Sequence, residues 1–307
     1  MSQMAKPSQS VVLVGGPDAG KTNYLGRLWM ALDAEKGTIT KNGMPAQVEY
    51  LRAIAASLNS GAFAQRTPPG VFESTTIPVK WTDKSTCKCG ELVVPDCAGE
   101  QWERIHRDRE WDSDWEQSVA SMAGCILFFR GTSEHNIAPM DWSSQSELMK
   151  CLEESAANGE SPHKLPTQVI LVDWLQCLSN AYRDIQETEL PLRVSIVLSA
   201  WDMVPKESQG SDPDEFLSAN LPLLHDYLSA NPSLFRSKSF GVSISEGVLS
   251  EGDSPFMRRY LGDPSTTGYV VLSSKGNVAK SKDLTLPLAW AFGCACPEFQ
   301  VHGGVKS

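Results

Sequence analysis

The chain has 307 residues, of which 41% are hydrophobic and 21% are charged, as is typical of a globular protein with a sizeable core. Its formal net charge of −10 argues against free binding to nucleic acid or to an anionic membrane, because both require a basic patch. No apolar run approaches the length of a membrane span, and residues 1–10 lack the apolar core of a signal peptide, so we expect a cytoplasmic protein.

The first predicted element, residues 11–14 (VVLV), is a strand buried on both faces. The eight residues that follow, GGPDAGKT, match the pattern G-x-x-x-x-G-K-[ST] of a phosphate-binding loop at every fixed position. Gly15 and Gly20 permit backbone angles that let successive N–H groups turn inward on a phosphate. Lys21 brings a positive charge to the β- and γ-phosphates, and the Thr22 hydroxyl can bind Mg²⁺.

Residues 21–35 carry apolar side chains at helical spacing, so the predicted helix begins at this loop and points its N-terminus at the phosphates. That context disfavours the alternative, a glycine-rich turn with a chance lysine. Residues 36–44 contain two glycines and predict a turn or a small excursion, and residues 46–59 predict an amphipathic helix that ends before Gly61. Residues 65–70 (QRTPPG) are stiff and non-helical.

A second motif follows two strands, predicted over residues 72–81 and 86–95 and joined by a turn. The second strand ends at Asp96, and Gly99 follows three residues later (DCAG). An aspartate at the tip of a buried strand can hold Mg²⁺ through water, and a glycine N–H can meet the γ-phosphate. D-x-x-G is a weak pattern alone, and its meaning here comes from the phosphate loop that precedes it.

The rest of the chain continues to alternate strands and helices. The expected elements are helix 101–122, strand 124–130, loop 131–136, helix 144–155, linker 158–164, helix 166–182, strand 193–198, helix 212–230, strand 237–243, irregular stretch 248–267, edge strand 269–273 and closing helix 284–292. This alternation predicts an α/β fold with a doubly wound, mostly parallel sheet and helices on both faces. Ligands bind outside the carboxyl ends of such strands.

Two further motifs lie at predicted strand exits. Residues 199–202 (SAWD) follow one buried strand, and residues 243–245 (SIS) end the next. Together with the phosphate loop and Asp96 they should converge on one edge of the sheet. We see no internal repeat or break in composition, and we therefore expect a flexible N-terminus over residues 1–9, a single domain over 10–300 and a tail over 301–307.

The eight cysteines are scattered, and in a reducing compartment they are expected to be buried thiols rather than disulfides. Two C-x-C pairs, Cys87/Cys89 and Cys294/Cys296, leave a zinc site open as an alternative, although their spacing is not that of known zinc modules. The five histidines form no spaced cluster.

With these motifs the sequence resembles the Ras-like, translation-factor-related (TRAFAC) class of P-loop GTPases. GGPDAGKT resembles the phosphate loop, DCAG the second switch, SAWD the base-reading motif and SIS the loop behind the base. Within the class it resembles the bacterial double-GTPase group, often encoded beside effector and adaptor genes in conflict systems, through Gly61, residues 66–68 (RTP) and the PLAW of the closing helix. The resemblance covers residues 10–292 and implies insertions in switch I, which contains the helix of residues 46–59, and near the C-terminus.

The resemblance also implies the cofactors, GTP or GDP with Mg²⁺, and the residues that hold them. The implied nucleotide contacts are Gly15, Asp18, Ala19, Gly20, Lys21, Thr22, Asn23, Gly99, Asp202, Ser243 and Ile244. The implied Mg²⁺ ligands are Thr22, Thr67 and Asp96, with Thr75 and Thr76 as alternatives for Thr67. The groups implied in hydrolysis are Glu100, Gln101 and Arg66, the last as an arginine acting in cis or as an exposed loop residue.

The sequence departs from the class at two functional positions. The base motif is usually N/T-K-x-D, and Ala200 replaces its lysine, so guanine affinity is expected to fall unless Trp201 or a nearby side chain covers the base. Asp202, the specificity element, is retained. Glu100 stands where Ras-like members carry a water-orienting glutamine, and Gln101 comes one residue late, so hydrolysis is expected to be slow.

The leading hypothesis is therefore a GTP-binding, slowly hydrolysing switch that acts on a partner protein, in a bacterial defence or conflict system. One alternative is a nucleotide-stabilised scaffold with degenerate hydrolysis, and another is a P-loop ATPase or nucleotide kinase. A kinase would need a lid with several arginines, and the adjacent Arg258 and Arg259 are more typical of a solvated pair. We expect no binding to membranes and no direct binding to nucleic acid.

Overall fold

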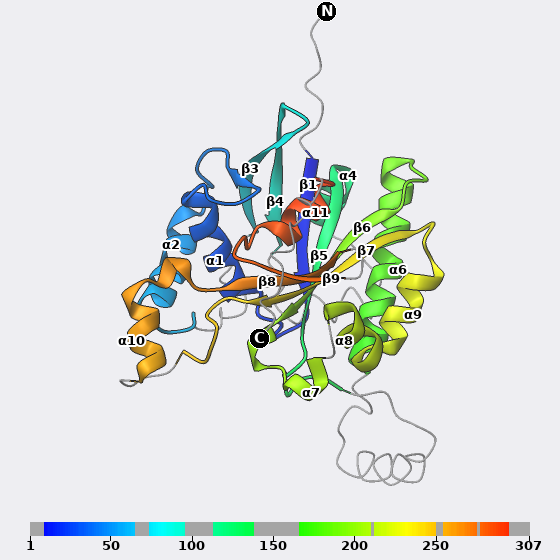
Figure 1. The fold of residues 1–307 in the computed structure, drawn as a ribbon. Helices are drawn as coiled ribbons and strands as arrows, with labels where there is room; N and C mark the ends of the chain where they lie inside the picture. Colours follow the sequence, from blue (N-terminus) through cyan, green and yellow to red (C-terminus); the bar gives the residue numbers. More distant parts are fainter. Residues whose placement is uncertain are drawn as a thin grey trace, which may run out of the picture.

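The computed structural model describes residues 9–64, 74–95, 113–137, 166–209, 212–249, 254–274 and 277–294. Within these ranges a nine-stranded sheet runs through the molecule in the order β2-β3-β4-β1-β5-β6-β7-β8-β9 (Figure 1). The strands are β1 Gln9–Gly15, β2 Thr40–Lys41, β3 Thr75–Asp83, β4 Thr86–Val94, β5 Met122–Arg130, β6 Leu192–Ser199, β7 Phe235–Ser243, β8 Tyr269–Ser274 and β9 Asn277–Ser281.

The centre of the sheet is parallel and its flanks are antiparallel. Strands β4, β1, β5, β6 and β7 pair in parallel. The hairpins β3–β4 and β8–β9, with β2 and the β7–β8 pair, add the antiparallel flanks. The expected α/β class is confirmed, with a mixed sheet around a parallel centre. Parallel strands bring their carboxyl ends to one edge, where ligands bind in such sheets.

Helices pack on both faces of this sheet (Figure 1). They are α1 Lys21–Asp33, α2 Val48–Asn59, α4 Ser113–Ala120, α6 Thr167–Gln186, α7 Lys206–Gln209, α8 Pro213–Asn220, α9 Pro222–Ala230, α10 Pro255–Gly262 and α11 Leu286–Ala291, with short 3₁₀ turns η2 Trp201–Met203 and η3 Pro264–Thr266. Val11 and Leu13 of β1 belong to the core under α1, α2 and α11, and Val12 and Val14 to the core under α4, α6, α8 and α9. This double burial explains why the strand is apolar throughout.

Helix α2 is held against the C-terminal part of the chain as well as against α1. Gly26 lets α1 approach α2 closely, since a Cβ there would lie 2.3 Å from Ile54 Cγ2. Ile54 and Leu58 of α2 also cluster with residues of α10, where the Tyr260 hydroxyl donates to the Leu58 carbonyl at 2.9 Å. Figure 1 shows α10 beside α2 at one end of the sheet. The helix expected over residues 46–59 is thus a packed element, although it lies in a long connection.

The structure corrects two expectations about helices. The single helix expected over residues 212–230 is two, α8 and α9, broken at Leu221. Pro222 explains the break, because proline lacks an N–H and disfavours a helical residue before it. The stretch 248–267, expected to be irregular, contains α10, whose first turn is capped by Ser254 Oγ accepting from the Met257 N–H at 3.0 Å.

Two expectations about strands are also corrected. The strand over residues 269–273 is not an edge strand, because β9 pairs with the outer side of β8. The turn expected over residues 36–44 contains the short strand β2. The helix expected over 144–155 and the linker over 158–164 lie outside the described residues, as does most of helix 101–122, of which the structure describes α4.

Candidate functional site

A cleft of about 650 Å³ opens at the carboxyl edge of the parallel strands. It falls within the range of roughly 300–1,000 Å³ that is typical of small-molecule sites. The phosphate loop, the loops after β5 and β7, and η2 all contribute to it. Its lining residues are Asp18, Ala19, Gly20, Lys21, Thr22, Asn23, Tyr24, Phe63, Ala64, Phe128, Arg130, Thr132, Glu134, His135, Ser199, Ala200, Asp202, Met203, Val242, Ile244, Ser245, Gly247 and Val248. The phosphate loop and Asp202, expected to converge, therefore share one cleft.

The phosphate loop has the backbone that its glycines permit. Gly15 and Gly20 have positive φ values of 151° and 88°, and Asp18 lies in the left-handed region at 55°. A Cβ on Gly15 would lie 2.7 Å from the Phe128 carbonyl oxygen, and one on Gly20 would lie 3.0 Å from Ser199 Oγ. The loop therefore passes too close to β5 and β6 for larger residues. Gly15 itself does not line the cleft.

The first turn of α1 faces the cleft. Lys21, Thr22 and Asn23 line it, and this turn carries no acidic residue. Lys21 Nζ donates to the carbonyl oxygens of Gly15 and Gly16, the second at 2.8 Å, which holds the ammonium group over the loop. A helix N-terminus with exposed N–H groups and a nearby cation is suited to an anion such as phosphate.

The Asn23 side chain ties α1 to the segment that follows α2. Its Oδ1 accepts from the Ala64 N–H at 2.9 Å. This bond occupies the amide oxygen, so the side chain of Asn23 has a structural partner in addition to its place on the cleft wall. Ala64 and its neighbour Phe63, which is 42% exposed, also line the cleft.

An ion pair on the phosphate loop was not expected from the sequence. The Asp18 carboxylate accepts from Arg130 Nη1 at 3.1 Å and from Ser133 Oγ at 2.8 Å. Arg130 is the last residue of β5 and lines the cleft. The sequence feature that could have drawn attention to Arg130 is its position as the basic residue that ends the apolar strand GCILFFR.

The base-reading motif is joined directly to the phosphate loop. Ser199, at the end of β6, donates through Oγ to the Ala19 carbonyl at 2.7 Å and is 7% exposed. Ala200 then takes a left-handed conformation with φ of 51°, which starts η2 and brings Asp202 to the cleft. Ala200 also lines the cleft, at the position where the class carries lysine.

Trp201 does not cover the cleft, contrary to one expectation. Its indole is 4% exposed and packs edge-on against Phe216, with ring centroids 5.5 Å apart. Gly241 makes room for it, since a Cβ there would lie 2.5 Å from Trp201 Cδ2. The tryptophan therefore anchors η2 in the core. Exposed apolar residues line the cleft in its place, namely Phe63, Met203 and Val248.

The three residues of the SIS motif, 243–245, do not all face the cleft. Ile244 and Ser245 line the cleft. Ser243 is fully buried and does not line it, and its Oγ accepts from the Glu246 N–H at 2.9 Å. Ser243 was expected to contact the nucleotide, but the structure places it behind the loop and not in the lining of the cleft.

Several predicted site residues lie outside the described residues. They are Arg66, Thr67, Asp96, Gly99, Glu100 and Gln101. Of the alternatives to Thr67, Thr75 is fully buried, and its hydroxyl has no hydrogen-bond partner among the described residues, whereas Thr76 is exposed. Neither threonine lines the cleft.

Comparison with known proteins gives the family. The sequence matches the family described as Double-GTPase 1 over residues 12–291, which is most of the chain. The chain belongs to the Double-GTPase 1 family. This membership confirms the resemblance to P-loop GTPases of the double-GTPase group and supports guanine-nucleotide binding.

Other comparisons add little to the Double-GTPase 1 assignment. No curated protein matches the sequence. A solved structure, the signal recognition particle receptor SRb-GTP/SRX complex from Chaetomium thermophilum, is similar at 14% identity, covering 85% of this chain and 99% of that chain. Its TM-score of 0.34 is too low to support an argument about function.

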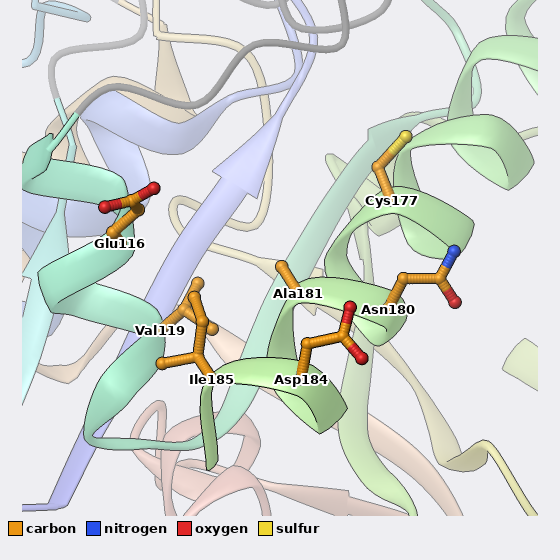
Figure 2. Close-up of a pocket in the computed structure, with 7 residues that line it drawn as sticks. All are labelled: Glu116, Val119, Cys177, Asn180, Ala181, Asp184 and Ile185. Carbon is orange, nitrogen blue, oxygen red and sulfur yellow. The ribbon is translucent and has the colours of Figure 1, made fainter. Parts of the chain in front are cut away.

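A second cavity of this Double-GTPase 1 chain, of about 330 Å³, lies between α4 and α6 (Figure 2). Glu116 and Val119 line it from α4, and Cys177, Asn180, Ala181, Asp184 and Ile185 line it from α6. Its charged lining consists of two carboxylates, Glu116 and Asp184, which would repel a phosphate. The described residues that line this cavity include no lysine or arginine, whereas Lys21 and Arg130 line the first cleft.

Two remaining alternatives concern a zinc site and a membrane-spanning helix. The described residues contain no group of three or more His, Cys, Asp or Glu side chains placed to hold a metal ion. Cys87 and Cys89 are exposed on β4, Cys294 is buried, and Cys296 lies outside the described residues. Of the helices in those ranges, none is both long and apolar enough to cross a membrane.

Proposed function

We propose that the chain binds GTP, hydrolyses it slowly and acts as a switch on a partner protein. One observation carries the proposal: in a member of the Double-GTPase 1 family, a single cleft joins a glycine-bent phosphate loop with Lys21 to the half-buried Asp202. A triphosphate needs the N–H groups and the positive charge of such a loop, whereas a guanine base needs a carboxylate that accepts its hydrogen bonds. One guanine nucleotide needs both in the same site.

The phosphates would lie on the loop and the first turn of α1. Lys21 supplies a positive charge, and the N–H groups of the loop supply donors. Thr22 follows Lys21 on the cleft wall, and its hydroxyl would hold Mg²⁺ beside the phosphates. The bound ion would neutralise charge on the β- and γ-phosphate oxygens. Thr67 and Asp96 remain our proposed further ligands.

The base would lie against Asp202. Its carboxylate can accept from the ring N–H and the exocyclic amine of guanine, whereas adenine presents no such pair of donors. Sites that bind substrate donors reject analogues without them by roughly 10⁴–10⁵. Because Ala200 offers no long stem, we propose that Phe63, Met203 and Ile244, which line the cleft, cover the base.

Switching would arise in the loops of residues 61–70 and 99–110. Ala64 is bonded to Asn23 in the first turn of α1, so the beginning of the first loop lies next to the phosphate site. Loops that contact a γ-phosphate order with the triphosphate and relax without it. Glu100 is an acceptor when ionised and would sit unfavourably beside the γ-phosphate, so hydrolysis would be slow and a partner would speed it. A cytoplasmic role in bacterial defence and a single domain over residues 10–300 are parts of this proposal.

The positions of Arg258 and Arg259 give no support to a nucleotide kinase. A kinase lid would bring arginines over the phosphates. Arg258 and Arg259 are exposed on α10 and absent from the lining of the cleft. Arg259 instead lies over the Phe256 ring, 5.8 Å from its centroid.

Hydrogen exchange tests the switch. Exchange in residues 61–70 and 99–110 should be slower with a non-hydrolysable GTP analogue than with GDP, while β6 should be protected equally in both. Equal protection of the two loops in both states would favour the scaffold with degenerate hydrolysis. Binding of ATP as tight as GTP would favour the ATPase.

A further inference from the structure

The ion pair between Asp18 and Arg130 places a negative and a positive charge together beside the site proposed for the phosphates. Asp18 belongs to the loop proposed to hold a triphosphate, and a carboxylate there repels the phosphates. Arg130 Nη1 at 3.1 Å and Ser133 Oγ at 2.8 Å both donate to it. A cation is thus built into the phosphate end of the cleft in addition to Lys21.

The backbone of Arg130 is fixed by the elements around it. Gly15 of β1 pairs with Phe128 of β5, so Arg130 extends two residues past the last paired residue of β1. Its neighbour on the other side is Ser199, at the same level of β6. Its carbonyl oxygen accepts from the Asn136 side chain at 2.8 Å and from the Ser133 N–H at 3.2 Å. The guanidinium therefore projects from a rigid base between the phosphate loop and the base-reading motif.

The guanidinium has donors that Asp18 does not use. Arg130 Nε is buried and has no hydrogen-bond partner among the described residues. The side chain as a whole is 36% exposed and lines the cleft, so it has room to turn. A guanidinium offers five N–H donors in a planar fork, which suits phosphate as well as carboxylate oxygens. One arginine can therefore contact both anions together.

We propose that Arg130 is a phosphate-binding arginine that Asp18 holds in position. When a nucleoside triphosphate binds, the guanidinium gives up part of its contact with Asp18 and donates to phosphate oxygens. This inference rests on the proposed function and adds to it a cis-acting cation from β5 that is independent of Arg66.

The same contact would stabilise the transition state of hydrolysis. A water oxygen bonds to the γ-phosphorus while the bond from that phosphorus to the bridging oxygen breaks. The electron pair stays on the diphosphate and one proton goes to solvent. Arg130 keeps its proton throughout and stabilises the negative charge that develops on the departing diphosphate.

A simpler role would be that Arg130 only neutralises Asp18. The two roles differ once Asp18 is uncharged. A neutraliser becomes dispensable in the Asp18→Asn protein, whereas a phosphate-binding arginine is still needed there. Asparagine is a suitable replacement because it tolerates the left-handed backbone at this position.

The experiment measures affinities for GDP and a non-hydrolysable GTP analogue, and single-turnover hydrolysis, in wild type, Arg130→Gln, Asp18→Asn and the double variant. Arg130→Gln should lower the affinity for the analogue about 10- to 100-fold, which corresponds to the loss of one charge-assisted hydrogen bond. It should lower the affinity for GDP by less. It should slow hydrolysis as well. Asp18→Asn should tighten the analogue, and adding Arg130→Gln to it should again weaken the analogue at least tenfold. Arg130→Lys should restore the ion pair but only part of the affinity.

Several results would overturn the proposal. The double variant binding the analogue as well as Asp18→Asn, or Arg130→Lys recovering full affinity, would reduce Arg130 to a neutraliser. Arg183→Gln, which removes a surface ion pair with Glu189, is the matched control and should change no nucleotide affinity. Failure of wild type to bind any guanine nucleotide would refute the proposed function itself, a result distinct from normal binding that ignores Arg130.

Discussion

The hydrogen bond from Ser199 to Ala19 joins the end of β6 to the phosphate loop, and its removal tests whether that link prepares the loop for nucleotide. Ser199 Oγ lies 2.7 Å from the Ala19 carbonyl oxygen, and the serine is 7% exposed. In Ser199→Ala a buried acceptor loses this partner, which costs about 1–3 kcal/mol. We expect the free energy of unfolding, measured in urea, to fall by that amount.

Nucleotide affinity should fall as well. Without the hydrogen bond from Ser199, the phosphate loop has to be ordered when the nucleotide binds, and this ordering reduces the free energy of binding. The net value of one such bond, about 0.5–1.5 kcal/mol, corresponds to a loss of roughly two- to tenfold in GTP affinity by calorimetric titration. Ser195→Ala is the matched control. Ser195 lies on the same strand, is fully buried and donates at 2.7 Å to the Pro287 carbonyl, outside the cleft.

The control should lose similar stability and keep its GTP affinity. If both variants lose affinity equally, the effect follows global stability and the proposed link is wrong. Unchanged affinity in Ser199→Ala would refute it also, because the loop would then hold its shape alone.

Three further variants test the cleft. Lys21→Ala should abolish GTP binding in calorimetry with the fold intact by circular dichroism, because the loop loses its ammonium group; Lys41→Ala, which removes an ion pair with Asp33, should bind normally. Asp202→Asn should shift preference from guanine toward xanthine nucleotides in competition binding, and an unchanged preference would remove Asp202 from base reading. Gly241→Ala should lower the free energy of unfolding by about 1–3 kcal/mol and weaken GTP binding, since a Cβ 2.5 Å from the Trp201 ring displaces η2. Its control, Gly262→Ala, meets no atom within 4 Å and should change neither thermal unfolding nor binding.

The parts of the fold that could be predicted are those that depend on the residue pattern of one short stretch of sequence. The phosphate loop was recognisable because its glycines and Lys21 serve one short backbone shape, and the structure gives Gly15 and Gly20 the positive φ values that shape requires. The apolar run at residues 11–14 predicted a strand buried on both faces, which β1 is. The break between α8 and α9 was also within reach, since Pro222 marked it.

The parts that could not be predicted depend on contacts between distant residues. Nothing near Ser199 indicates that it bonds to Ala19, and nothing near Arg130 points to Asp18, because the sheet brings these pairs together. The motif alone allowed Trp201 to cover the base, but its ring packs beside Gly241. Its direction is set by the core under η2 and not by the motif around it.

The identity of the nucleotide that co-purifies with the protein tests the central claim most directly. Purified wild-type protein would be denatured, and the released nucleotide identified by chromatography against standards, with Lys21→Ala purified in parallel. We predict GDP or GTP from wild type and none from Lys21→Ala, because the phosphate loop and Asp202 line one cleft and are proposed to hold one guanine nucleotide there. An adenine nucleotide from wild type, or the same nucleotide from both proteins, would contradict the account.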